Sequence, residues 1–123
     1  MQEAPVKVLL VGVDIGEEAD FEHSMEELAS LAEAAEKEVV GQIVQRLDHV
    51  NKALYIGTGK VAEVRRLAEE RGAQEVVFDN SLTPSQVRNL GKALELTVID
   101  RTNLILVIFA IRAPTRDAKL QVE

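Results

Sequence analysis

The sequence predicts an α/β domain in which a small, mostly parallel sheet of about four strands carries helices on both faces. Two observations predict this class. Short apolar runs alternate with segments of helical periodicity along the chain. The first run, residues 6–14, is apolar at nearly every position, which is typical of a strand buried on both faces of a parallel sheet. A length of 123 residues suits one domain with a single core.

The first half of the chain adds two helices and a second strand. Ser24 and Glu27 have the spacing of a capping box, so we expect a helix to begin at Ser24. Its inward stripe consists of Met25, Leu28, Ala29, Leu31, Ala32 and Ala35. Residues 39–47 form the next predicted strand, and their polar members place it near an edge of the sheet. The segment 60–71 is a second helix, which Gly72 can end in a left-handed conformation.

The second half carries the clearest local signal, which follows a compact predicted strand at 75–79. Thr83 suits the N-cap of a helix, Pro84 its first position and Gln86 the third, where a side chain can close a capping box. The side chains directed at the core are those of Val87, Leu90 and Leu94. Another strand is predicted at 97–100.

The most hydrophobic run of the protein, residues 104–111, follows this last strand. Eight consecutive apolar residues cannot form one face of an amphipathic element, so we expect the run to be covered on nearly all sides. Its β-branched residues favour a strand, whereas its length suits a buried strand and a short helix equally well. The residues by themselves leave both forms open.

Composition excludes several classes of function. A net charge of -7 argues against a general nucleic-acid binder, and one Tyr, three Phe and no Trp offer no stacking surface for bases. The absence of cysteine excludes disulfides and thiolate metal sites. The longest apolar run is far short of a membrane span, and no secretory signal is visible, which fits a cytoplasmic location.

The segment Gly57-Thr58-Gly59-Lys60 invites comparison with a phosphate-binding loop, because glycines let backbone N–H groups approach a phosphate at a helix N-terminus. A Walker-type loop needs a glycine five residues before the second glycine, and Ser or Thr after the lysine. Leu54 and Val61 stand at those positions, so we reject a Walker-type site. Weak anion or nucleotide binding by Gly57, Thr58, Gly59 and Lys60 remains one hypothesis, and a plain glycine turn into a helix is the other.

Other polar residues are candidates for catalysis or metal binding. Asp14, Asp79 and Asp100 each follow an apolar strand and could meet at one edge of the sheet, where they would hold Mg²⁺ or accept a phosphoryl group. Asp is also common at strand ends as a turn or cap residue. His23 and His49 fall in predicted loops without partners at metal-ligand spacing, so we expect both to be solvated. No serine lies in a nucleophile elbow, and we expect no catalysis by this chain alone.

Four basic residues, Arg101, Arg112, Arg116 and Lys119, cluster around the apolar run and the end of the chain. Charges that flank a buried element are usually solvated ends of that element. The alternative is a partner-facing surface that offers several cations to phosphate groups.

Four stretches carry a family resemblance: Tyr55-Ile-Gly-Thr-Gly-Lys-Val61, Phe78-Asp79, Leu82-Thr-Pro-Ser-Gln-Val-Arg-Asn-Leu90 and residues 100–123. In the same order, they closely resemble the N-terminal domain of the HflX family of ribosome-associated GTPases. The resemblance implies an α/β subdomain over residues 1–113 and the start of a truncated helical segment at 114–123. It also implies that 102–111 is a helix, and that the helical and GTPase domains, with GTP and magnesium, lie in the missing remainder.

The resemblance further implies a partner, the large ribosomal subunit, which family members bind and some split under stress. Our first hypothesis is therefore a non-catalytic binding and regulatory module that holds no cofactor or metal of its own. The second is an independent nucleotide-binding α/β domain that uses the Gly57 to Lys60 loop. A third is a scaffold that only positions the missing helices.

Overall fold

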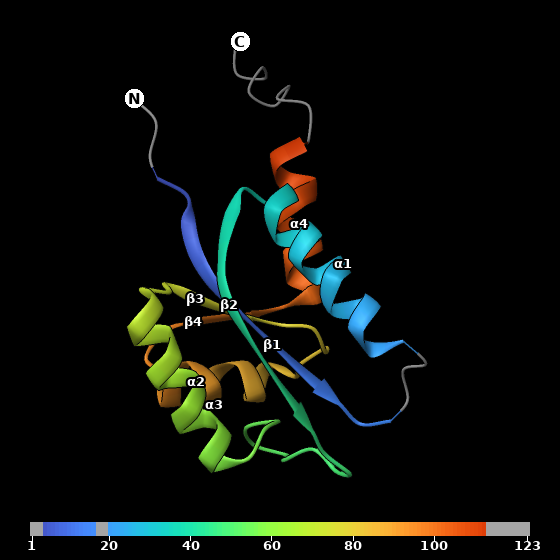
Figure 1. Ribbon diagram of the computed structural model, residues 1–123, viewed down its shortest axis with the longest axis vertical. Coiled ribbons are helices and arrows are strands. Elements are labelled where there is room, and N and C mark those ends of the chain that lie inside the picture. Colours follow the sequence, from blue (N-terminus) through green and yellow to red (C-terminus); the bar gives the residue numbers. More distant parts are fainter. Residues whose placement is uncertain (1–3, 17–19, 113–123) are drawn as a thin grey trace.

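A computed structural model describes residues 4–16 and 20–112, and it confirms the predicted class (Figure 1). The first half of the chain forms β1 (Val6–Asp14), α1 (Phe21–Ala34), β2 (Lys37–Arg46) and α2 (Thr58–Arg71). The second half forms β3 (Glu75–Phe78), α3 (Pro84–Leu94), β4 (Thr97–Asp100) and α4 (Arg101–Arg112).

All four strands are parallel and lie in the order β2-β1-β3-β4. The polar strand β2 is at an edge, as its composition predicted, and β1 is central. Strand β1 is the most buried because β2 and β3 pair with it on both sides and helices cover both of its faces. At Gly12, a Cβ atom would overlap with the side chains of Phe21 and Met25, so glycine lets α1 lie close to β1.

Two apolar clusters, one on each face of the sheet, form the core. Helices α1 and α4 lie side by side on one face, over Val8, Leu10 and Val77. Helices α2 and α3 cover the other face, where alternate residues of the same strands, such as Leu9 and Val76, are buried. The clusters follow from the two-residue period of strands, which sends neighbouring side chains to opposite faces.

The start of α1 differs from the prediction. The helix begins at Phe21, and Asp20 is its N-cap, with a carboxylate oxygen that accepts a hydrogen bond from the His23 backbone N–H at 3.1 Å. Ser24 and Glu27 therefore lie inside the helix, and His23 lies in α1 rather than in a loop. The sequence offers two possible N-caps, Asp20 and Ser24, and the use of Asp20 makes the helix about one turn longer. Both histidines, His23 and His49, are exposed, as expected.

The caps of the later helices were predicted correctly. Gly72 ends α2 with φ 70° and ψ 27°, in the left-handed region. Thr83 and Gln86 form the capping box of α3, with Pro84 in its first turn. The second strand begins and ends slightly earlier than predicted, at Lys37 and Arg46.

The run 104–111 is helical, as the family resemblance implied, but the expectation that it is covered on nearly all sides is wrong for the described residues. Only Leu104 and Ile108 are buried against the sheet. Leu106, Phe109 and Ile111 are 56%, 64% and 42% exposed. A helix lying on one face of a sheet can bury one side only, so this stretch leaves apolar side chains in solvent. The predicted helical segment at 114–123 lies outside the described residues.

Candidate functional site

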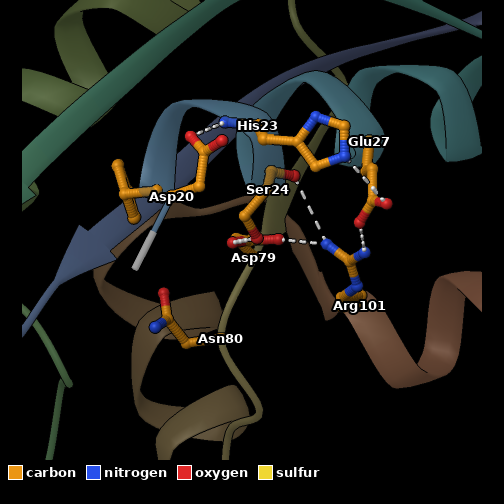
Figure 2. A pocket seen from close by; sticks show the side chains of 8 residues that line it. Asp20, His23, Ser24, Glu27, Asp79, Asn80 and Arg101 are labelled. Atoms are coloured by element: carbon orange, nitrogen blue, oxygen red, sulfur yellow. Dashed lines mark hydrogen bonds and ion pairs between the residues drawn. The ribbon is translucent and has the colours of Figure 1, made fainter. Parts of the chain in front are cut away.

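The strand order creates one favourable place for a ligand. From the central strand β1 the chain turns to one side of the sheet, and from its neighbour β3 it turns to the other. The carboxyl ends of β1 and β3 therefore form the switch point, where open α/β sheets usually bind ligands. A pocket of about 460 Å³ lies there (Figure 2), and its lining residues are Asp20, Phe21, His23, Ser24, Glu27, Asp79, Asn80 and Arg101.

At this pocket the side-chain amide of Asn80 joins the ends of β1 and β3, because it forms the two hydrogen bonds that a paired backbone residue would form. The Val13 N–H donates to Asn80 Oδ1 at 3.0 Å, and Asn80 Nδ2 donates to the Val13 carbonyl at 3.1 Å. The Asp79 N–H donates to the Val11 carbonyl at 2.9 Å. These bonds continue the pairing of β1 with β3 beyond Phe78, the last residue of β3, and so fix the position of Asp79.

Asp79 is the centre of a polar cluster that joins three elements. Its Oδ1 accepts from Arg101 at 2.6 Å, and its Oδ2 accepts from Ser24 Oγ of α1 at 2.7 Å. Arg101, at the start of α4, also contacts Glu27 of α1 at 2.8 Å. The Asp79 side chain is 6% exposed and that of Arg101 27%. Figure 2 shows the guanidinium between the two carboxylates.

Arg101 keeps its charge in this setting. Burial by itself lowers the pKa of the guanidinium, but its hydrogen bonds and charge interactions with Asp79 and Glu27 outweigh burial and raise the pKa above its ordinary value. A raised folded-state pKa contributes stability that is present below the unfolded-state pKa and lost only as pH rises through the folded-state value. That window lies far above neutral pH, so we expect no dependence of stability on Arg101 titration near neutrality.

The three strand-end aspartates do not form a metal site in the described part of the chain. Asp14 Oδ1 accepts from the Gly16 N–H at 2.9 Å, and Asp100 accepts from the backbone N–H groups of Leu82 and Asn103 at 2.9 and 3.0 Å. Asp79 is used by Arg101 and Ser24. The turn-and-cap alternative is therefore confirmed for Asp14 and Asp100. Within residues 4–16 and 20–112, no group of three His, Cys, Asp or Glu could hold a metal ion.

The segment Gly57 to Lys60 lies away from the pocket, and none of its four residues lines it. Gly57 is the N-cap of α2, with φ −69° and ψ 157°, and no side chain caps the helix there. A Cβ atom at Gly57 or Gly59 would meet nothing within 4 Å, so the first turn is open to solvent. Lys60 Nζ contacts Glu63 at 2.9 Å, which partly neutralises the cation that a phosphate would use.

The structure separates the predicted basic residues. Arg101 is the first residue of α4 and Arg112 the last, which puts them about 16 Å apart along the helix. Arg101 is engaged by Asp79 and Glu27, whereas Arg112 is exposed. Arg116 and Lys119 lie outside the described residues.

Sequence reasoning missed the contributions of Ser24, Glu27 and Asn80 to the pocket. Asp79 and Arg101 were each selected, but for separate roles. The signal that could have joined them is their position, because each directly follows one of two adjacent parallel strands.

Strand order, helices on both faces and a polar switch-point pocket define a doubly wound α/β domain. The chain belongs to the GTP-binding GTPase N-terminal family, whose model matches residues 22–110. Together with the HflX relatives described next, this match confirms the resemblance to HflX.

Similar proteins support this assignment. GTPase HflX of Alkalihalophilus pseudofirmus is 49% identical over 117 residues, which are 94% of this chain and 28% of that protein. GTPase HflX of Escherichia coli is 38% identical over 121 residues, 98% of this chain and 28% of that protein. A crystal structure of a GTP-binding protein from Sulfolobus solfataricus in complex with GDP superposes with a TM-score of 0.67 and 26% identity, over 94% of this chain and 34% of that one. The chain thus spans about 28% of the length of these HflX relatives.

Proposed function

We propose that this chain is a non-catalytic N-terminal binding and regulatory module of a GTP-binding protein that associates with the large ribosomal subunit and acts in the cytoplasm under stress. The observation that carries the proposal is the match of 22–110 to the N-terminal family of GTP-binding GTPases. The 123 residues contain no Gly-x-x-x-x-Gly-Lys-Ser/Thr loop. On this proposal GTP and magnesium bind in a domain outside this chain.

The chemistry of the switch-point pocket favours a structural role for its polar residues over catalysis. Asp79 and Arg101 neutralise each other, and Ser24 Oγ donates to a carboxylate that is already paired. An activated serine needs a base that can take its proton, and a carboxylate held by a guanidinium is a poor one. The pocket therefore joins α1, β3 and α4 rather than activating a nucleophile.

Ribosome association is tested by co-sedimentation with large ribosomal subunits. Full-length protein and a variant lacking residues 1–112 are compared with GTP bound to both. The proposal predicts that the deletion weakens pelleting at least tenfold while GTP binding persists. Equal pelleting of the two proteins would contradict the binding role.

The second candidate function is nucleotide binding by Gly57 to Lys60, and the uncapped first turn of α2 favours it. Because Glu63 neutralises Lys60, Glu63→Gln should tighten nucleotide binding severalfold if the site is real, and Lys60→Ala should abolish it. Calorimetric titration of the chain with ATP and GTP measures both. The absence of binding heat at millimolar nucleotide in all three proteins removes this candidate.

A further inference from the structure

The outer side of α4 presents an apolar surface that the described fold does not use. Its members are Leu106, Phe109 and Ala110, which are exposed on the side of the helix away from Leu104 and Ile108. Residues three and four positions apart lie on one side of a helix, so Leu106, Phe109 and Ala110 form a continuous stripe. A helix that is apolar on all sides is normally covered on all sides.

A groove between α1 and α4 extends this surface toward the sheet. It has a volume of about 460 Å³, and its lining residues are His23, Glu26, Glu27, Ser30, Leu31, Arg101 and Ile105. Leu31 and Ile105 give it an apolar floor. Ile105 and Phe109 are one helical turn apart, so the groove and the stripe form one surface, which we call the α4 face.

The negative charge of α1 beside the α4 face indicates that a partner should carry basic residues. Helix α1 carries four exposed glutamates and no Lys or Arg. Two of them, Glu26 and Glu27, line the groove, and Glu27 is already paired with Arg101. A second copy of the chain would bring two such acidic helices toward each other, in a protein of net charge -7. A partner helix with an apolar stripe flanked by Lys or Arg would bury the stripe and place a cation beside Glu26.

The position of the α4 face near the end of the described chain favours a partner segment from the same polypeptide over a separate molecule. Helix α4 is the last described element, and the chain leaves it at Arg112, at the end of this same face. The HflX relatives are more than three times as long as the chain. A segment tethered this closely has a high effective concentration at the α4 face, which a free partner lacks.

We infer that the α4 face is the docking surface for a helix of the same polypeptide beyond residue 123, with an apolar stripe flanked by basic residues. The inference rests on the proposed function, because it requires this chain to be the N-terminal module of a longer protein. It adds that the α/β domain is attached to the remainder through a packed interface as well as through the chain.

The 123 residues contain no cysteine, so a single introduced thiol can be labelled specifically within them. Phe109→Cys places a thiol on the α4 face, and Ala62→Cys places the control thiol on the exposed side of α2, across the sheet. Maleimide reaction is followed by mass spectrometry of the peptide that carries each thiol, in the 123-residue chain and in full-length protein without ribosomes. We expect both thiols to react readily in the chain, and Phe109→Cys alone to be protected at least tenfold in full-length protein.

Three results would overturn the inference. Equal reactivity of Phe109→Cys in both proteins would show an uncovered face. Protection within the 123-residue chain would assign the face to a second copy, if it grew with concentration, or to residues 113–123, if it did not. Protection that needs added ribosomal subunits would assign it to a partner in trans. Ribosome co-sedimentation tests the proposed function independently of the labelling experiment. A negative result in one experiment therefore does not imply a negative result in the other.

The charge of the partner has its own readout. Glu26 is exposed beside the groove, and Glu26→Lys reverses one of the charges that a basic helix would meet. In the Phe109→Cys background of the full-length protein, this change should reduce the protection severalfold, more at low salt than at high salt. Unchanged protection would contradict a partner with basic flanks.

Discussion

At the scale of single residues, the best-defined feature is a buried carboxylate with two partners. Asp79 receives a guanidinium from α4 and a hydroxyl from α1, so one side chain ties together segments that are 55 and 22 positions away in the sequence. Removing the Asp79 carboxylate leaves the mostly buried guanidinium with only the exposed Glu27, which costs more than losing a surface ion pair.

Asp79→Ala is therefore expected to lower the free energy of unfolding by about 2 kcal/mol, because Ser24 loses its acceptor and Arg101 keeps only its exposed partner Glu27. Urea denaturation monitored by circular dichroism measures the change. Glu27→Gln is the matched control, since it removes the exposed partner of the same guanidinium and should cost below about 1 kcal/mol. Similar losses for the two variants would contradict the special role of Asp79.

The members of this cluster could be identified from the sequence, but their contact with one another could not. Asp79 and Arg101 were selected as strand-end and basic residues, and Ser24 and Glu27 as the cap of a helix that in fact begins earlier. Local patterns identify turns and caps because their hydrogen bonds span a few residues. The Asp79 to Arg101 contact depends on which strands are neighbours, and that is a property of the whole sheet.

At the scale of elements, the helix ends were the most predictable part of the fold where one cap stood alone. Gly72 and the Thr83 capping box have their expected geometry. Helix α1 had two candidate caps, and the capping-box spacing of Ser24 misled the prediction. The burial of helix α4 was predicted wrongly for a different reason. An apolar run indicates that its side chains are better buried than exposed, but it does not show whether the described fold buries them.

The two ends of α2 give a paired prediction. Gly72 has positive φ and open space around its missing Cβ, so Gly72→Ala should cost about 1 kcal/mol from backbone strain alone. Gly59 has equally open space inside the first turn of the helix, where Gly59→Ala should be neutral or stabilise by about 0.5 kcal/mol. Thermal unfolding of both variants measures the difference, and an equal effect at the two positions would contradict the assigned backbone geometry.

Helix α3 offers a prediction that isolates a single cap. Thr83→Ala removes the side-chain acceptor of the Gln86 N–H and should lower the free energy of unfolding by about 1 kcal/mol. Thr83→Ser keeps the hydroxyl and should recover most of that loss. If serine destabilised as much as alanine, the cap would not be the source of the effect.

At the scale of the whole molecule, net negative charge restricts how the protein could meet ribosomal RNA. Arg101 is engaged within the fold, so the candidate contacts are Arg112, which is exposed, with Arg116 and Lys119 beyond it in the sequence. If these three residues contact phosphates, reversing them in the full-length protein should weaken co-sedimentation with large subunits and lower the slope of log affinity against log salt by about 2.

A control triple of the same charge change is available on the other face of the sheet. Arg66, Arg88 and Lys92 are exposed on α2 and α3, and reversing them should leave co-sedimentation largely unchanged. Equal losses for the two triples would indicate a response to net charge rather than contacts made at the end of α4.

The account as a whole requires that phosphate-bond cleavage occurs outside these 123 residues. GTP turnover by the purified chain, measured beside full-length protein, is the most direct test of that claim. We predict release of phosphate by the full-length protein and none above buffer by the chain. Sustained turnover by the chain that disappears in its Lys60→Ala variant would contradict the account.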